Sequence, residues 1–169
     1  MLEIGTREIA LASILGALSA TLEVIPGPPF DIPFPLLPRI SWDATGIPMM
    51  ISLLLYGSVC SVYTCLIGCS IIFLRGNVFG GILKVIAELT TLLAFASLRR
   101  RVVAASTVAV ASRVAVMTVS NYYLLQIFYG MPEPVVSGLL APIGLFNLTQ
   151  GLINIVPAYI IYLRVKQNK

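Results

Sequence analysis

Hydrophobic residues run along this chain in long stretches that are separated by short polar or proline-containing breaks. An apolar stretch of about 20 residues can cross the roughly 30 Å hydrocarbon core of a bilayer as a helix. The pattern predicts an all-α integral membrane protein with six transmembrane helices, in a single domain over residues 1–169. The expected helices cover residues 9–25, 44–56, 58–74, 79–98, 102–129 and 139–163.

Two of these helices come from one long uncharged stretch, which has no charged residue after Asp43 as far as Leu74. A single helix of that length, at 1.5 Å per residue, would be far longer than the hydrocarbon core is thick. We therefore place a break at residues 56–58, Tyr-Gly-Ser, with a short helix on each side.

The segment 26–42, PGPPFDIPFPLLPRISW, contains six prolines, which exclude a regular helix. It is also rich in Phe, Ile and Leu, whereas an ordinary surface loop would be more polar. Long ordered connections of this kind are often lids or binding loops. We expect residues 26–42 to form a lid over a site at the outer side of the membrane.

The amino-acid composition is that of a membrane protein, and it argues against several classes of function. The chain is 58% hydrophobic and only 11% charged, with a mean hydropathy of +0.96, whereas soluble domains are about 25% charged. Six helices leave no room for an ATPase or another aqueous catalytic domain. The chain has no histidine, no paired catalytic carboxylates and no nucleophile–base spacing, so we expect no enzyme activity, no cofactor and no metal site. Cys60, Cys65 and Cys69 are expected to pack as small apolar residues.

Basic residues gather at the ends of the expected helices. With six spans, Arg7, the cluster 99–101 and the tail with Arg164, Lys166 and Lys169 all fall on one side. Cytoplasmic loops carry an excess of Lys and Arg. The charge pattern therefore predicts that both termini are cytoplasmic.

Polar residues in three of the expected helices lie at a similar depth in the outer half of the membrane. Lys84 and Glu88 are one turn apart on one face of the fourth expected helix. Asn121 lies two turns below the outer end of the fifth. On the sixth, Asn147 and Gln150 share a face with Asn154. Charged groups at this depth indicate a functional site. Two alternatives remain, because Lys84 and Glu88 could pair with each other and single amides could join helices. Arg113 lies deeper, either as a structural residue bonded to carbonyls or Glu88, or as part of the site.

A pocket of this composition has apolar walls, amides, one ammonium and one carboxylate. It suits a flat, heteroatom-rich small molecule such as a vitamin ring, and it suits a metal ion poorly. Tyr122 and Trp42 are candidates to stack on such a ring, although part of the aromatic set is expected to mark the outer interface.

Small residues form a stripe on the first expected helix. Ala12, Gly16 and Ala20 recur every four residues, which allows another helix backbone to approach closely. The stripe fits either packing within the bundle or a docking face for a partner subunit.

The runs RVAVMTVSNYYLLQIFYG and LFNLTQGLINIVPAYIIY resemble the riboflavin-type substrate-binding subunits (S components) of energy-coupling factor (ECF) vitamin transporters. The stripe at Ala12, Gly16 and Ala20 is similar to the docking motif of that family, and residues 38–68 resemble its loop and its glycine-broken helix pair. The resemblance implies a multi-pass subunit of a prokaryotic plasma membrane. It would bind a vitamin outside the cell and topple inward in complex with a transmembrane coupling subunit and two ATPase subunits.

Residue by residue, the resemblance implies that Asn121 and Asn147 contact the ligand. Gln150 stands where riboflavin-type members usually carry a lysine, a charge for which Lys84 could compensate. Riboflavin is favoured, and another vitamin such as pantothenate is the alternative. A stand-alone carrier driven by protons or sodium is a second hypothesis, with Glu88 as the coupling group.

Overall fold

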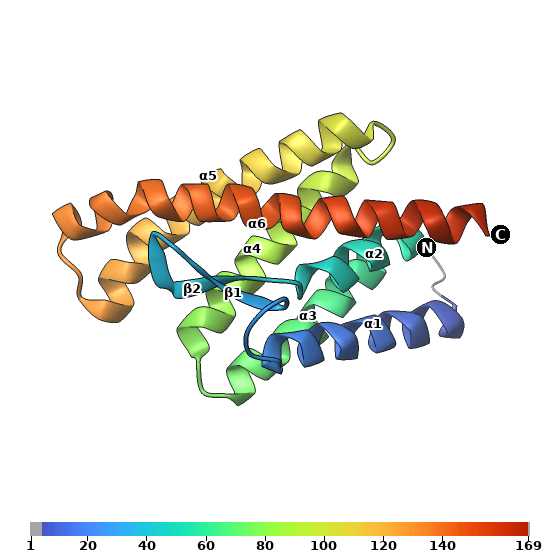
Figure 1. Cartoon of the computed structure of the whole chain (residues 1–169), viewed down its shortest axis with the longest axis horizontal. Coiled ribbons are helices and arrows are strands. Elements are labelled where there is room, and N and C mark those ends of the chain that lie inside the picture. Colours follow the sequence, from blue (N-terminus) through green and yellow to red (C-terminus); the bar gives the residue numbers. More distant parts are fainter. Residues whose placement is uncertain (1–4, 169) are drawn as a thin grey trace.

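The computed structural model describes residues 5–168 and contains six helices and one β-hairpin (Figure 1). Six helices were expected, and the structure confirms that number among the described residues. The elements are α1 (Thr6–Val24), β1 (Asp31–Phe34), β2 (Leu37–Asp43), α2 (Gly46–Tyr56), α3 (Ser58–Leu74), α4 (Val78–Ser97), α5 (Val102–Tyr129) and α6 (Glu133–Gln167). Lys169, part of the expected basic tail, lies outside the described residues.

Consecutive helices run in opposite directions (Figure 1). α2 and α3 form a tight antiparallel pair around Gly57, whose φ of 90° favours glycine, and the Thr64 hydroxyl of α3 donates to Ser52 of α2 at 2.9 Å. The start of α1, the end of α6 and the α4–α5 turn lie toward the same end of the molecule (Figure 1). We call this the basic end, and its cations are Arg7, Arg99, Arg100, Arg101, Arg164 and Lys166.

The proline-rich segment is a two-stranded antiparallel hairpin, a structure that the all-α expectation did not contain. Asp31 pairs with Asp43 and Ile32 with Trp42, and the register becomes irregular between Pro33 and Phe34. Proline lacks the N–H that a ladder needs, so the pairing stays short and lies at a sheet edge.

Helix α6 begins at Glu133, six residues before the expected start at residue 139. The prolines around it explain the difference, because Pro132 is the N-cap and another proline lies in the first turn. At that position the missing N–H would have had no helical partner, and the fixed φ suits a helix. The α5–α6 connection is therefore shorter than the sequence indicates.

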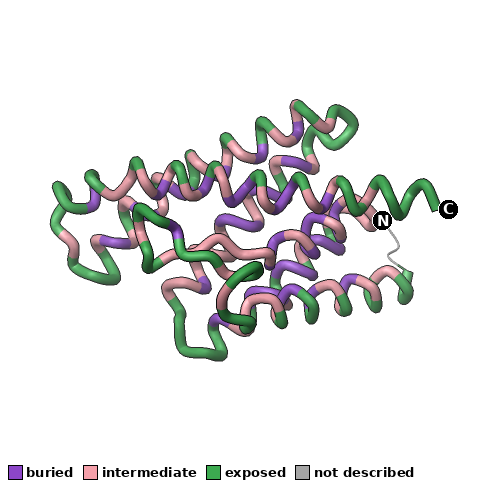
Figure 2. The backbone as a smooth tube through the Cα atoms, in the orientation of Figure 1, coloured by how far each residue is buried: buried purple, intermediate pink, exposed green. Residues whose placement is uncertain are grey.

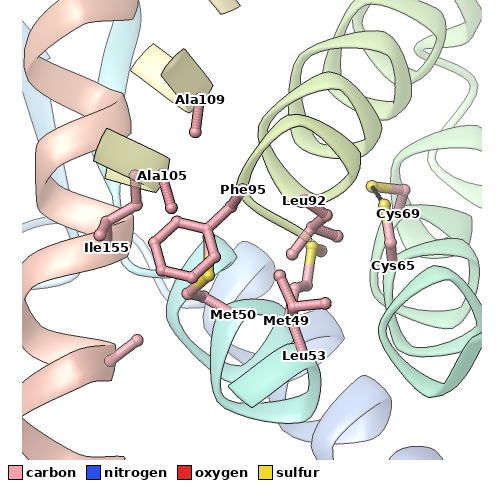
Figure 3. Close-up of a cluster of buried hydrophobic side chains, with 11 residues drawn as sticks. Met49, Met50, Leu53, Cys65, Cys69, Leu92, Phe95, Ala105, Ala109 and Ile155 are labelled. Carbon is pink, nitrogen blue, oxygen red and sulfur yellow. Dashed lines mark hydrogen bonds between the residues drawn. The ribbon is translucent and has the colours of Figure 1, made fainter. Parts of the chain in front are cut away.

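The apolar core lies between α2, α3, α4, α5 and α6. Figure 3 shows Phe95 and Leu92 of α4 facing Met49, Met50 and Leu53 of α2, with the alanines of α5 close by. Cys65 and Cys69 of α3 belong to the same cluster and are free thiols, as is Cys60. Small residues on α5 let α6 and α4 approach closely.

Many large apolar side chains of the helices are exposed, and Figure 2 shows exposed positions along α1, α3, α4, α5 and α6. Among the described residues, α4, α5 and α6 are long and apolar enough to cross a membrane, and α2 and α3 are shorter apolar helices. With 11 residues, α2 is about 16 Å long, about half the thickness of a hydrocarbon core. The hairpin directly precedes the N-terminal end of this short helix.

Candidate functional site

The aromatic side chains of the hairpin pack against α6, and one of them also forms a hydrogen bond to that helix. The Trp42 indole Nε1 donates to Thr149 Oγ1 at 2.8 Å. Phe34, only 3% exposed, packs edge-on against Trp42 with ring centroids 5.1 Å apart and against Phe146 at 5.6 Å. These contacts hold the hairpin against α6.

The base of the hairpin is joined to α6 and α4 through Asp43. Its backbone N–H donates to Gln150 Oε1 at 3.2 Å, and its carbonyl accepts from Gln150 Nε2 at 2.9 Å. Its carboxylate pairs with Lys84 Nζ, which also lies 3.8 Å from Glu23 of α1. Burial opposes a charge on Asp43, but the Lys84 ammonium and hydrogen bonds from Thr45 hold its pKa below the usual value. The carboxylate therefore stays ionised at neutral pH and keeps the pair intact.

A second polar cluster lies deeper, where α4, α5 and α6 meet. Arg113 Nη1 donates to Glu88 Oε1 at 3.0 Å and to Thr91 Oγ1 at 3.1 Å, and Arg113 Nε donates to Asn147 Oδ1 at 3.3 Å. The Asn154 amide donates to both Glu88 oxygens, at 3.1 and 2.9 Å. Arg113 and Glu88 are 2% and 1% exposed, so this is a buried ion pair whose remaining hydrogen-bonding groups have partners.

The two clusters are continuous. Gln150 Nε2 donates both to the Asp43 carbonyl and to Asn154 Oδ1, each at 2.9 Å. Asn154 in turn reaches Glu88, which pairs with Arg113. Among the described residues, no fully buried side-chain nitrogen or oxygen lacks a partner. The hairpin base is thus connected through hydrogen bonds to Asn147.

The two asparagines expected to contact the ligand both face the bundle interior. Asn121 is 6% exposed on the buried face of α5, and Asn147 is 2% exposed on that of α6. Each amide nitrogen donates to a carbonyl one turn back in its own helix, at 2.8 Å for Asn121 and 2.9 Å for Asn147.

Tyr122 lies nearer the end of α5, half-buried beside a smaller apolar cluster that includes Leu125 and Val136. Its hydroxyl donates to Glu133 Oε1 at 3.0 Å, which joins α5 to the start of α6. Tyr123 and Tyr129, each 58% exposed, point outward as interface aromatics do.

One alternative from the sequence is wrong. Lys84 and Glu88 do not pair with each other, because Lys84 binds Asp43 and Glu88 binds Arg113. Glu88 is the carboxylate partner that the structural alternative for Arg113 named. The partner of Lys84 was missed, since Asp43 lies 41 residues away and reaches it only through the hairpin.

The small-residue stripe of α1 is used within this chain. Ala12 and Gly16 are buried against α3, where the Ala12 carbonyl accepts from Thr64 Oγ1 at 3.1 Å. A Cβ on Gly16 would lie 2.8 Å from Ile67 Cβ, so only glycine fits this contact. Ala20 is half-buried at the edge of the same face. The small residues therefore serve the α1–α3 packing.

The fold and the site define a helical membrane protein with a polar interior beneath a covering hairpin. A sequence model of the family described as "ECF transporter, substrate-specific component" matches residues 7–162. The match covers most of the chain, and the protein belongs to this family of transporter components.

A solved structure gives the same fold. It is described as "Structure and mechanism of the S component of a bacterial ECF transporter", and it is 21% identical to this chain. The likeness has a TM-score of 0.80 and covers 95% of this chain and 96% of the other. No curated protein matches the chain.

Proposed function

We propose that the protein is the high-affinity vitamin-binding subunit of an ECF importer and that riboflavin or a related flavin is its ligand. The observation that carries this proposal is the position of Asn121 and Asn147. Asn121 of α5 and Asn147 of α6 are both buried, and the hairpin packs on α6 through Trp42 and Asp43. Amides with apolar and aromatic neighbours suit a flat ring that carries several heteroatoms.

The choice among vitamins depends on Gln150 and Lys84. Gln150 replaces the lysine that riboflavin-type members usually carry, and its amide is already bonded to the hairpin base and to Asn154. Lys84 is paired with Asp43 and lies close to Glu23, so its charge is largely neutralised within the protein. Lys84 therefore does not supply the free cation that Gln150 lacks. The preference for a flavin rests on the resemblance of the α5 and α6 sequences to riboflavin-type members, and pantothenate stays the alternative.

The test is binding by the purified protein in detergent. Riboflavin fluorescence should be quenched on binding, and labelled pantothenate should not compete. Asn121→Ala and Asn147→Ala should each weaken binding by about 1–3 kcal/mol, because a buried ligand group then loses its hydrogen-bond partner.

Asn168→Ala is the matched control, because it removes the same amide at an exposed position of the basic end. It should bind as the unchanged protein does. If both interior variants also bind normally, the ligand lies elsewhere. If pantothenate binds in place of riboflavin, the site is retained and the vitamin is the other candidate.

Transport would depend on partners. We propose that the basic end faces the cytoplasm, that the hairpin faces outward, and that α1 carries the docking face for a transmembrane coupling subunit with two ATPases. In this arrangement, Ala12 and Gly16 shape the docking face by letting α3 pack close behind it, and Ala20 lies at its edge. The ligand would enter beneath the hairpin and move inward when the subunit topples.

An ion-coupled carrier is the competing hypothesis, with Glu88 as the coupling group. Glu88 is paired with Arg113 of α5 and accepts two hydrogen bonds from Asn154 of α6, so its carboxylate already joins α4 to both helices. Depletion of ATP in cells with a preserved ion gradient separates the two hypotheses. Uptake should stop if the protein is an ECF subunit and continue if it is a carrier.

A further inference from the structure

A cavity of about 300 Å³ opens at the basic end, far from the hairpin site. It lies between α2, α4 and α6, and none of its lining residues belongs to the polar clusters around Asn147. Among its lining residues are Leu53, Phe95, Arg99, Tyr159, Tyr162 and Lys166. The cavity therefore combines a cationic rim, two tyrosines and an apolar floor.

The rim of the cavity is positively charged. Arg99 and Lys166 are exposed, and the three ion pairs among the described residues use only Lys84 and Arg113 as cations. Arg100 and Arg101 are next to Arg99 in sequence and add to the same positive potential. A cavity of this charge attracts an anion.

The floor and the outer wall are apolar. Phe95 and Leu53, which form part of the core, are 0% and 1% exposed. Leu163 lines the cavity and is 39% exposed, so an apolar surface continues from the cavity onto the outside of α6. A small hydrated anion matches the rim alone, whereas an amphiphile matches the rim, floor and outer wall together.

We propose that this cavity binds the phosphate-bearing headgroup of an anionic phospholipid. The phosphate lies between Arg99 and Lys166, and the acyl chains leave along Leu163 into the bilayer. Basic pockets between membrane helices bind such headgroups, and tyrosines are common at the level of the headgroups. The proposal does not depend on which vitamin the hairpin site binds.

The test uses the full-length protein in lipid nanodiscs or mixed micelles, with phosphatidylglycerol as the probe and phosphatidylcholine for comparison. Phosphatidylglycerol should bind in a saturable manner, measured by native mass spectrometry, and should raise the unfolding temperature. The double variant Arg99→Gln/Lys166→Gln should bind it with roughly 30-fold lower affinity, because two cations near the headgroup are removed.

Arg100→Gln/Arg101→Gln is the matched control, since it removes the same charge at the same end and neither residue lines the cavity. It should keep most of the affinity, and a cooperative thermal unfolding transition without added lipid should show that both double variants are folded. Equal loss in the two double variants would overturn the proposal, as would equal binding of phosphatidylcholine. If free glycerol phosphate protects the protein as well as the lipid does, the bilayer is not the source of the ligand. If the cavity variant keeps lipid affinity but loses a co-purifying membrane protein, the cavity is a protein interface instead.

Discussion

At the scale of single residues, the main polar feature of the interior is the buried ion pair between Arg113 and Glu88. Moving two charges from water into a bundle is costly, and the attraction offsets that cost only when geometry is good and the remaining groups are bonded. Here Thr91, Asn147 and Asn154 supply those bonds. The pair joins α4 to α5, and its amide partners bring in α6.

Removal of one charge should therefore be far more harmful than removal of both. We expect Arg113→Met to lower stability by about 3–5 kcal/mol, because Glu88 is left buried without its cation. The double variant Arg113→Met/Glu88→Gln should recover a large part of that loss. Thermal unfolding of the ligand-free protein in detergent measures both. Equal unfolding temperatures for Arg113→Met and the unchanged protein would show that the pair contributes nothing.

At the scale of elements, the helices were easier to predict than the hairpin and the partners of the polar residues. Runs of apolar residues and the break at Gly57 are local features, and the observed α2 and α3 lie on either side of that glycine. The prolines exclude a helix over residues 26–42. They do not predict the hairpin, because each strand needs the other as its partner across a turn and no local sequence pattern specifies that pairing.

The same reasoning explains which parts of the candidate site could be predicted from the sequence. Helix periodicity placed Asn147, Gln150 and Asn154 on one face, and all three are buried. The partners of Lys84 and Gln150 depend on where the hairpin base lies, since Asp43 is 41 residues from Lys84 and 107 from Gln150. Contacts that need the tertiary position of a loop are not visible in spacing along a helix.

The small-residue stripe of α1, at Ala12, Gly16 and Ala20, gives a prediction about the packing of α1 against α3. Gly16→Leu should destabilise the isolated protein and weaken ligand binding, because the new side chain meets Ile67 and the Thr64 carbonyl. Ala17→Leu is the matched variant, since Ala17 is exposed on the adjacent face of α1. It should leave stability and ligand binding unchanged while reducing uptake if a partner docks on that exposed face. Normal ligand binding and stability in Gly16→Leu would contradict the α1–α3 packing.

At the scale of the whole molecule, the alternating helix directions and the charge distribution support each other. Cations gather at the end that holds the start of α1, the end of α6 and the α4–α5 turn (Figure 1). The hairpin and the α5–α6 turn lie toward the other end (Figure 1). Lys and Arg are retained on the cytoplasmic side of membranes, so the basic end is the one expected inside the cell.

Labelling from the two sides of the membrane tests this orientation. Leu36 is 60% exposed at the hairpin turn and Asn168 is exposed at the basic end, so each accepts a reporter cysteine with little structural cost. The native cysteines are at most 3% exposed and give little background. A membrane-impermeant maleimide added to intact cells should label Leu36→Cys but not Asn168→Cys, and both should react after permeabilisation.

Because six alternating spans return the chain to its starting side, labelling of Asn168→Cys in intact cells would mean that the helices do not all cross the membrane or that the molecule is inverted. Parallel labelling of Leu36→Cys decides between these two. Inversion protects the hairpin, whereas an even number of crossings between the two positions leaves both cysteines accessible from outside.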